Sequence, residues 1–314
     1  MRVAVTGMGG YVGGWLCETL TRRGHLVTGQ DVVPSPMCGC FDLAAGAARR
    51  AWLDDCDPDL VIHLAAVYGR VWGEKDLRRT AAVNAGLTAE VARDVAARGI
   101  RMMYMSSSEV YGYTAWRPSP LAEDARLLPL NMYGLSKAWG EEAARVYAPD
   151  GLAIVRLSMP YGPPAVLPDM TDPHFSARVG PTGFNALHTM LWQGFHGLPI
   201  TVHEGTERAY TWAGDAAEGI ALIAESRQEG TWNVTRGPED MVPSADLARM
   251  CAGLTGSRSE IRTIPPPAQV TRRKLLDASK LAGLGWKPAV PLEDGMAGTL
   301  GYVSRFGPDG RWQG

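Results

Sequence analysis

The sequence RVAVTGMGGYVG at residues 2–13 joins an apolar strand to a glycine-rich turn and then to a helix. Its glycines are three residues apart where the strand becomes the helix. Glycine allows a positive φ in a tight turn and lets backbone N–H groups approach a phosphate, which the N-terminal end of a helix favours. The stretch therefore predicts a dinucleotide-binding turn, formed by Gly7, Gly10, Tyr11, Val12 and Gly13.

Asp31 ends the second expected strand, about 20 residues beyond the glycine turn, where a carboxylate accepts hydrogen bonds from the adenosine ribose. Val32 and Val33 follow it, so no arginine stands beside it to receive a 2′-phosphate. This pattern favours NAD over NADP. The alternative is that Asp31 is a solvated turn residue at a strand end.

Short β-branched runs alternate with alanine-rich helical windows through the first half of the chain, which predicts an α/β Rossmann fold with a doubly wound parallel sheet. We expect residues 1–165 to form the NAD-binding domain, with 211–236 returning to it. Residues 166–210 and 237–314, which begin with a proline-rich stretch, should form a smaller, irregular α/β substrate-binding lobe. The expected strands are 2–6, 26–30, 60–64, 101–106, 153–157 and 231–234, and the expected helices are 10–23, 80–98, 132–147 and 215–225.

Composition is that of an ordinary globular protein, with 46% hydrophobic and 20% charged residues and a formal net charge of -2. The absence of a basic run argues against a nucleic-acid partner. No apolar run is long enough to span a membrane or to act as a signal peptide. Five cysteines without a CxxC pair fit reduced thiols in the cytoplasm. Cys38 and Cys40 lack a second ligand pair, so we expect no metal.

Tyr133 and Lys137 lie four residues apart on an expected helix and so share one face. A lysine ammonium beside a phenol should lower the phenol pKa and make it a better general base. Ser106, Ser107 and Ser108 follow an expected strand, at the sheet edge where such folds bind ligands. Taken alone, the tyrosine and lysine are more often a surface pair, and serines after a strand more often form turns.

The sequence resembles the extended short-chain dehydrogenase/reductases, specifically the NAD-dependent epimerase/dehydratase family that modifies nucleotide sugars. The similarity covers nearly the whole chain. It rests on an ordered set of segments: TGMGGYVG at 6–13, VIHLAA at 61–66, NAG at 84–86, SSSEVYG at 106–112, YGLSK at 133–137, RLSMPYGP at 156–163, RAY at 208–210 and LGWKP at 284–288.

The resemblance implies a catalytic triad of Ser107, Tyr133 and Lys137. Tyr133 would take a proton from a sugar hydroxyl, at C4, while hydride passes to NAD. Lys137 would hold the nicotinamide ribose, and Ser107 would bond the sugar oxygen. Besides the glycine turn, Asp31, Tyr133 and Lys137, the residues expected at the cofactor are Asp42, Leu43, Leu64, Ala65, Ala66, Asn84, Ser106, Met159 and Pro160.

Glu109 distinguishes the possible reactions, because in the resembled family an acid here handles a proton near C5 in decarboxylases and some dehydratases. Ser108 precedes it where the dehydratases carry an Asp-Glu pair, so 4,6-dehydration is disfavoured. Glu109 is therefore our fourth candidate catalytic residue. The alternative is that it caps the following turn.

Substrate contacts are less complete than in the resembled family. Met159 replaces an asparagine that contacts the substrate diphosphate, and the usual Arg-x-x-Asp before Asp277 is missing. Arg208 suits a diphosphate by bidentate hydrogen bonding, its alternative being a surface arginine. The expected substrate-binding residues are Arg70, which could pair with a sugar carboxylate, Ser108, Asn185, Arg208 and Arg273, with His174 and Arg178 as further pocket candidates.

Three functions follow from this pattern. The first is redox-neutral conversion of a nucleotide sugar through transient C4 oxidation, as in a 4-epimerase or a uronate decarboxylase. The second is an NAD(P)H-dependent 4-ketoreductase acting on a deoxysugar or secondary-metabolite intermediate. The third is a non-catalytic NAD-binding sensor. The resemblance also implies a homodimer through the helices at 80–98 and 132–147, where Ala143, Val146 and Tyr147 fit an apolar face.

Overall fold

A parallel sheet of seven strands forms the centre of the molecule. The computed structural model describes residues 1–35, 38–116, 120–166 and 183–313. Sheet order is β3-β2-β1-β4-β5-β6-β11. The chain runs outward from β1 in both directions, so the order reverses between β1 and β4, and such a switch point is where doubly wound sheets bind ligands. The strands are β1 (Arg2–Thr6), β2 (Leu26–Asp31), β3 (Gly39–Cys40), β4 (Leu60–His63), β5 (Arg101–Ser107), β6 (Ala153–Leu157) and β11 (Gly230–Val234).

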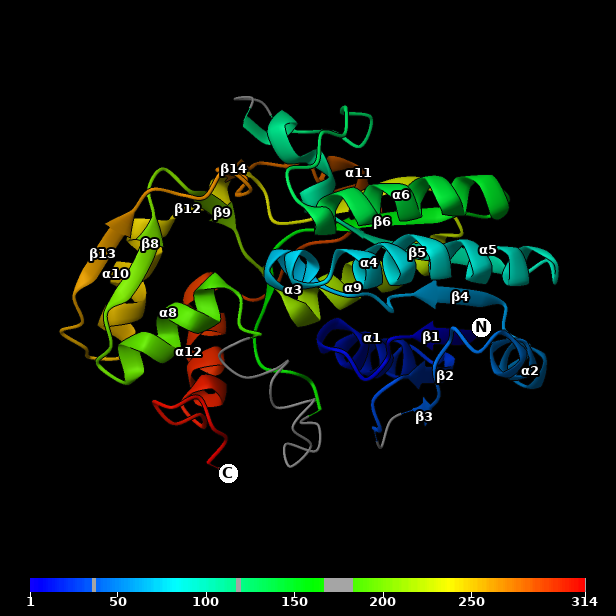
Figure 1. Cartoon of the computed structure of the whole chain (residues 1–314), viewed down its shortest axis with the longest axis horizontal. Helices are drawn as coiled ribbons and strands as arrows, with labels where there is room; N and C mark the ends of the chain where they lie inside the picture. The colour runs from blue at the N-terminus through cyan, green and yellow to red at the C-terminus, as the bar shows by residue number, and fades with distance from the viewer. Residues whose placement is uncertain (36–37, 117–119, 167–182, 314) are drawn as a thin grey trace.

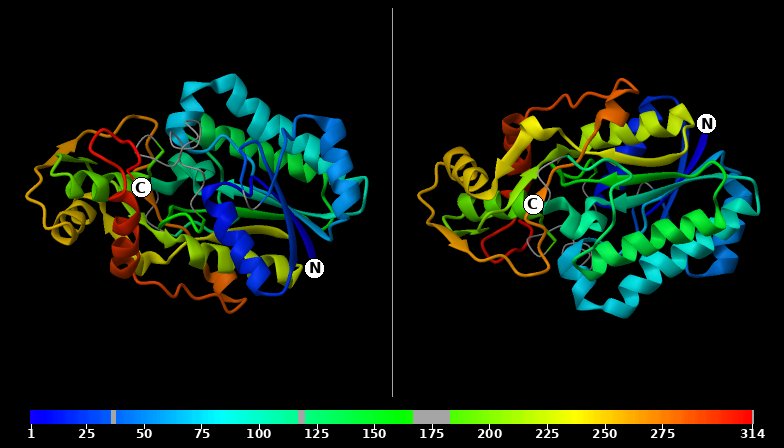
Figure 2. Two further views of the ribbon diagram at one scale, coloured as in Figure 1. Left: turned by 90° about the horizontal axis from the view of Figure 1, so that it is seen from below. Right: turned by 90° about the horizontal axis from the view of Figure 1, so that it is seen from above.

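Helices cover both faces of this sheet, as Figures 1 and 2 show. On one face α1 (Tyr11–Arg22) and α9 (Ala213–Ser226) pack over a core that includes Leu16, Ile220 and Trp232. On the other face α2 (Gly46–Cys56), α5 (Thr88–Ala96) and α6 (Met132–Tyr147) cover a second core. The expected Rossmann architecture is confirmed, because each expected strand is present within a residue or two of its predicted ends.

One expected helix, residues 80–98, is not a regular α-helix. It consists of α4 (Leu77–Ala81), a π-helical segment at Ala82–Leu87, and α5. In a π-helix the backbone hydrogen bonds span five residues, so the turn is wider than in an α-helix. This form is rare and often marks functional sites. Asn84 lies within it and is fully buried. Helical periodicity alone does not show this change of winding.

The second part of the chain forms a lobe at one end of the sheet (Figure 1). Its own core contains Tyr161, Leu191, Leu247 and Phe306. Three small sheets belong to this region, with orders β10-β7, β12-β9-β14 and β13-β8. The remaining elements are α3 (Gly69–Lys75), a 3-10 segment (Ser108–Trp116), β7 (Pro160–Tyr161), α8 (Ala186–Phe195), β8 (Ile200–His203), β9 (Glu207–Ala209), β10 (Thr211–Trp212), a 3-10 turn (Pro238–Asp240), β12 (Met241–Pro243), α10 (Ser244–Leu254), β13 (Ile261–Ile264), β14 (Arg273–Lys274), α11 (Ser279–Ala282) and α12 (Leu292–Val303).

None of the helices that the structure describes combines the length and the apolar composition that a membrane span requires.

Candidate active site

The glycine turn between β1 and α1 packs so closely against neighbouring backbone that side chains are excluded from it. Gly7 has a φ of 72°, and a Cβ placed there would be 2.7 Å from the backbone nitrogen of Ala65. A Cβ on Gly13 would be 2.5 Å from the Gly7 carbonyl oxygen. Gly10 caps α1 without a side-chain hydrogen bond, and the first turn of α1 holds no acidic residue. The free N–H groups and the positive end of the helix dipole fit a pyrophosphate.

Asp31 ends β2 beside this turn. Its Oδ1 accepts hydrogen bonds from the backbone nitrogens of Val32 (2.7 Å) and Val33 (3.2 Å). Its Oδ2 lies 3.3 Å from where a Cβ on Gly9 would be, so the carboxylate faces the glycine turn. Asp42 forms a local turn by accepting from Ala44, and the Leu43 side chain packs in the core.

The segment after β4 is fixed by the π-helical residue Asn84. Its Oδ1 accepts from the Val67 nitrogen at 2.8 Å, and its Nδ2 donates to the Val67 carbonyl (2.9 Å) and to the Ser136 hydroxyl (2.9 Å). Asn84 therefore ties the loop that contains Leu64, Ala65 and Ala66 to α6, between Tyr133 and Lys137. Its effect on a cofactor would be to position this loop.

Tyr133 lies near Ser107 at the carboxyl end of β5, close enough for the Ser107 hydroxyl to lower the pKa of the Tyr133 phenol. The pKa of Tyr133 is raised to about 12, chiefly by burial and also by the nearby Glu109 charge, while Ser107 acts in the opposite direction. The expected lowering of this pKa by Lys137 is therefore wrong for the protein alone, because burial dominates the shift.

The Lys137 side chain lies next to the carboxyl end of β5. Its Nζ donates to the Met105 carbonyl oxygen at 2.7 Å and lies 5.0 Å from the centre of the Tyr104 ring. Burial lowers the pKa of Lys137 to about 7, and the Glu141 carboxylate opposes this shift. Ser106 directs its hydroxyl to Glu141 at 2.6 Å, so only its backbone is left to face a cofactor.

Glu109 forms a buried ion pair with Lys274 of β14, a residue that the sequence analysis did not identify. Asn131 donates from Nδ2 to Glu109 Oε2 at 3.0 Å and also caps α6 by accepting from Gly134 at 2.9 Å. Burial opposes the charge on Glu109, but Lys274 and Asn131 outweigh it and lower the pKa of the carboxyl. Lys274 follows two arginines in TRRKLLD, and only the fold shows which of the three cations points inward.

Further cations surround this pair. Burial lowers the pKa of Lys274, and Arg208 and Arg70 lower it further, so both guanidinium groups lie near it. Arg208 donates from Nη1 to the carbonyls of Glu207 (2.7 Å) and Arg272 (2.6 Å), and from Nη2 to Thr271. The Arg208 guanidinium thus ties β9 to the segment before β14. Arg273 pairs with Glu207.

Met159 lies after β6 with a φ of 42°, a left-handed conformation that is uncommon for a residue other than glycine or asparagine. Its sulfur is 3.9 Å from the Lys274 ammonium. Asn185 caps α8 by accepting from His188 and donates to the Pro160 carbonyl at 2.9 Å. Ser108 is buried next to Glu109. His174 and Arg178 lie outside the described residues.

Within the described ranges, no three His, Cys, Asp or Glu side chains come close enough together to hold a metal ion. What the fold and the site define is an enzyme with a dinucleotide cradle whose Ser-Tyr-Lys group sits at the ends of parallel strands. NAD fits the cradle, because the glycines allow the turn to pack against the backbone after β4, the first turn of α1 carries no acidic residue, and Asp31 faces the turn.

Comparison with known proteins agrees with this geometry. Residues 3–235 match the model of the NAD dependent epimerase/dehydratase family, and the chain belongs to that family. It is 26% identical over 318 residues to the UDP-glucose 4-epimerase of Mycolicibacterium smegmatis, covering 96% of this chain and 98% of the relative. It is 28% identical over 292 residues to a dTDP-4-dehydrorhamnose reductase of Streptomyces griseus, covering 91% of this chain and 89% of the relative.

Among solved structures, the Thermus thermophilus UDP-glucose 4-epimerase in complex with NAD superimposes with a TM-score of 0.83. It is 25% identical, and the match covers 97% of this chain and 99% of that one. The chain is thus an NAD-dependent enzyme of this family, as the sequence predicts.

Proposed function

We propose that this enzyme oxidises the C4 hydroxyl of a nucleotide-linked sugar transiently and then reduces the ketone again, with either inversion at C4 or loss of a C5 carboxylate in between. The observation that carries the proposal is that Ser107 and Tyr133 lie close together at the end of β5, at the same edge of the parallel sheet as the glycine turn after β1. Bound NAD supplies the hydride acceptor and donor.

Tyr133 acts as the general base in this scheme, taking the hydroxyl proton as the alcohol is oxidised and returning it on reduction. Ser107 hydrogen-bonds the same substrate oxygen and orients it. Lys137 supplies a positive charge below the tyrosine that favours the phenolate. Since burial raises the pKa of Tyr133 to about 12, this ammonium and the cation of the bound cofactor must together offset the cost of the charged form.

The substrate should carry a negative charge close to Glu109. Among the described residues, the buried cations Arg208 and Lys274 and the half-buried Arg70 lie around the single carboxylate of Glu109. Uncompensated buried charge is costly, and an anionic ligand removes that cost. A sugar carboxylate or a diphosphate would meet this requirement, with Arg70, Ser108 and Asn185 as the proposed neighbours.

The test is product analysis with purified enzyme. UDP-glucose, UDP-glucuronate and dTDP-4-keto sugars would be incubated separately, and the products identified by mass and proton NMR. Turnover of a C4 alcohol without net change in reduced nicotinamide absorbance supports the proposal. Release of CO2 that is lost in Glu109→Gln indicates decarboxylation. Inversion at C4 without release of CO2 indicates epimerisation.

A second candidate is net reduction of a 4-ketosugar. Met159, which replaces the family asparagine, and Arg208, which is engaged with backbone carbonyls, leave fewer groups for a diphosphate. One relative is a dTDP-4-dehydrorhamnose reductase. Stoichiometric loss of NADH with a 4-keto substrate, and no turnover of any C4 alcohol, would support this candidate over the first.

We also propose a homodimer in the cytoplasm. Trp139 (45% exposed), Val146 (68%) and Tyr147 (44%) leave an apolar stripe along α6 next to α5, and the Arg93 guanidinium of α5 lies over the Tyr147 ring. Pairing two copies would bury this stripe in a four-helix bundle. All five cysteines are free thiols, which fits a reducing compartment.

A further inference from the structure

The buried carboxylate of Glu141 lies one helical turn beyond Lys137 and has no place in the proposed proton transfer. We propose that Glu141 is a positioning residue that keeps Lys137 protonated, and that Arg156 and Ser106 hold its carboxylate in place for this task. This inference rests on the proposed function only in assuming that the charge of Lys137 matters for turnover.

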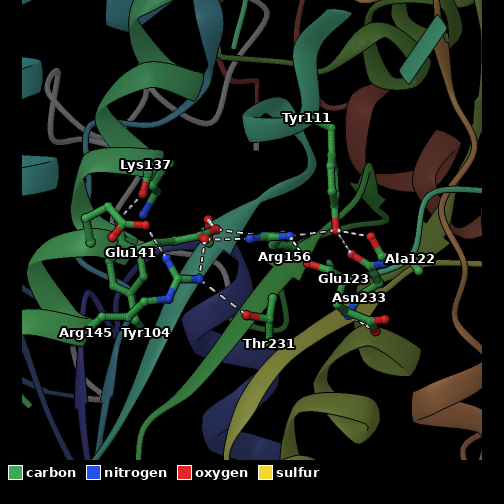
Figure 3. A network of polar contacts seen from close by, with 12 residues as sticks. Tyr104, Tyr111, Ala122, Glu123, Lys137, Glu141, Arg145, Arg156, Thr231 and Asn233 are labelled. Atoms are coloured by element: carbon green, nitrogen blue, oxygen red, sulfur yellow. Dashed lines mark hydrogen bonds and ion pairs between the residues drawn. The ribbon is translucent and has the colours of Figure 1, made fainter. Parts of the chain in front are cut away.

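Consecutive residues of β5 hold the two side chains. The Lys137 Nζ donates to the carbonyl of Met105 at 2.7 Å, and the hydroxyl of Ser106 donates to Glu141 Oε1 at 2.6 Å. Residues four apart on α6 lie on the same face of the helix, so Lys137 and Glu141 both approach β5 (Figure 3), near enough for the carboxylate to act on the charge of the ammonium.

Arg156 of β6 fixes the carboxylate from the other side. Its Nε donates to Glu141 Oε1 at 2.9 Å and its Nη2 to Oε2 at 2.7 Å, with both side chains almost completely buried. Burial opposes the charge of Glu141, but Arg156, with help from Ser106, lowers the pKa of the carboxyl below its usual value. Glu141 is therefore ionised at neutral pH.

The Arg156 side chain is held in turn by the segment after β5 and by β11. Its Nη1 donates to the Tyr111 hydroxyl at 2.9 Å and to the Glu123 carbonyl at 2.8 Å. Tyr111 donates to Asn233 Oδ1 at 2.8 Å, and Asn233 donates to the carbonyls of Leu121 and Asp277, each at 3.0 Å. Figure 3 shows Arg156 between Glu141 and Tyr111. The carboxylate thus has little freedom to turn away from Lys137.

Within the described ranges, titratable and charged groups face Lys137 from β4, β5 and α6 itself. His63 of β4 is buried between the hydroxyls of Thr6 and Thr88, and burial lowers its pKa to about 3, so it stays neutral. Tyr104 of β5 presents its ring. From α6 come Tyr133 and Glu141, and Glu141 itself meets Arg156, Arg145, Ser106 and Tyr104. Glu141 is the nearby group that opposes the effect of burial on the pKa of Lys137.

Lysine NMR offers a direct test in the protein without cofactor. The chain has five lysines, Lys75, Lys137, Lys274, Lys280 and Lys287, so a 13Cε-lysine spectrum is simple, and Lys137→Arg assigns the signal. In the wild type this signal should titrate near pH 7. In Glu141→Gln the midpoint of the Lys137 titration should fall by about one pH unit. At pH values above the midpoint, the protonated fraction of Lys137 is then about tenfold smaller than in the wild type. Glu141→Asp should restore most of the shift.

Two further variants separate this role from a structural one. Glu141→Gln leaves Arg156 buried without its partner, which can unfold the protein. Glu141→Gln/Arg156→Gln removes both charges together and should show the same lowered midpoint. Arg145→Gln removes the half-exposed cation bonded to the same carboxylate at 3.0 Å and should keep the wild-type midpoint. An unchanged midpoint in either folded Glu141→Gln variant would overturn the proposal.

The pH profile gives the second readout. If turnover requires protonated Lys137, kcat/KM should fall at alkaline pH, and Glu141→Gln should move that fall to lower pH by the same amount as the NMR midpoint. A merely structural role would reduce activity at all pH values alike. If no substrate is ever turned over, the proposed function fails while the NMR result still stands.

Discussion

Tyr133 carries the hydroxyl on which the proposed proton transfer depends, and the Ser107 hydroxyl and the end of β5 fix its position. Tyr133→Phe removes the acidic proton and nothing else, so turnover should fall by roughly 10²–10⁴-fold while the protein stays folded. Steady-state kinetics and a thermal melt would measure this. Tyr147→Phe, on the exposed face of α6, is the matched control and should retain full activity.

Glu109 and Lys274 depend on each other. Changing one leaves a buried charge without its partner, so Glu109→Gln or Lys274→Met should each lower the free energy of unfolding by about 3–5 kcal/mol. The double variant should lose less free energy of unfolding than the two single variants added together, because it leaves no buried charge without a partner. Urea denaturation of the four proteins measures the coupling. Additive losses would mean that the two groups act independently.

At the scale of the element, the N-terminus of α6 determines where Tyr133 lies. Asn131→Ala removes the cap on Gly134 and the amide bonded to Glu109, so stability should fall by about 1 kcal/mol and kcat should fall as well. Asp76→Ala removes a similar cap, on Arg79 at the start of α4. This control should lose similar stability without the drop in kcat, and equal losses of kcat in both variants would contradict the assignment.

The contact between α1 and α9 should weaken in acid. Arg23 bonds Glu225, and His25 bonds it as well, so the pKa of Glu225 falls from 4.5 to about 2. A carboxyl with a lowered pKa stabilises the folded state above its unfolded pKa, and this stabilisation is lost as pH falls from about 5 toward 2. Melting temperatures of wild type and Glu225→Gln should differ at pH 7 and converge near pH 2. A constant difference would contradict this.

The helices and strands show how much of the fold could be predicted from the sequence. Strands and most helices were predictable because short β-branched runs and alanine-rich helical windows leave clear local signals. The π segment at Ala82–Leu87 was not, since its side chains keep a helical pattern. Lys274 was missed for a different reason, because β14 comes close to Glu109 only in the folded chain. Nothing in the local sequence distinguishes Lys274 from the two arginines that precede it. The Tyr133 pKa was misjudged because burial is not visible in the sequence.

At the scale of the whole molecule, the proposed homodimer rests on the exposed apolar stripe of α6. Val146→Glu places a charge at a site that is 68% exposed in the single chain, so the fold should tolerate it while dimer formation is lost. Light scattering coupled to gel filtration would report the mass. Val32→Glu, at another exposed apolar site 48% accessible near β2, should leave the mass of the dimer unchanged. A wild type that is monomeric when dilute and fully active would remove the proposal.

The widened turn at Ala82–Leu87 affects how this chain should be aligned and engineered. A helix turns about 100° for each residue, so deleting one residue before Asn84 to restore a regular winding would rotate its amide away from Val67 and Ser136. A relative without the extra residue would have to hold the same loop by other contacts. A gap of one position against such a relative between Leu77 and Thr88 would be a structural difference and not an alignment error.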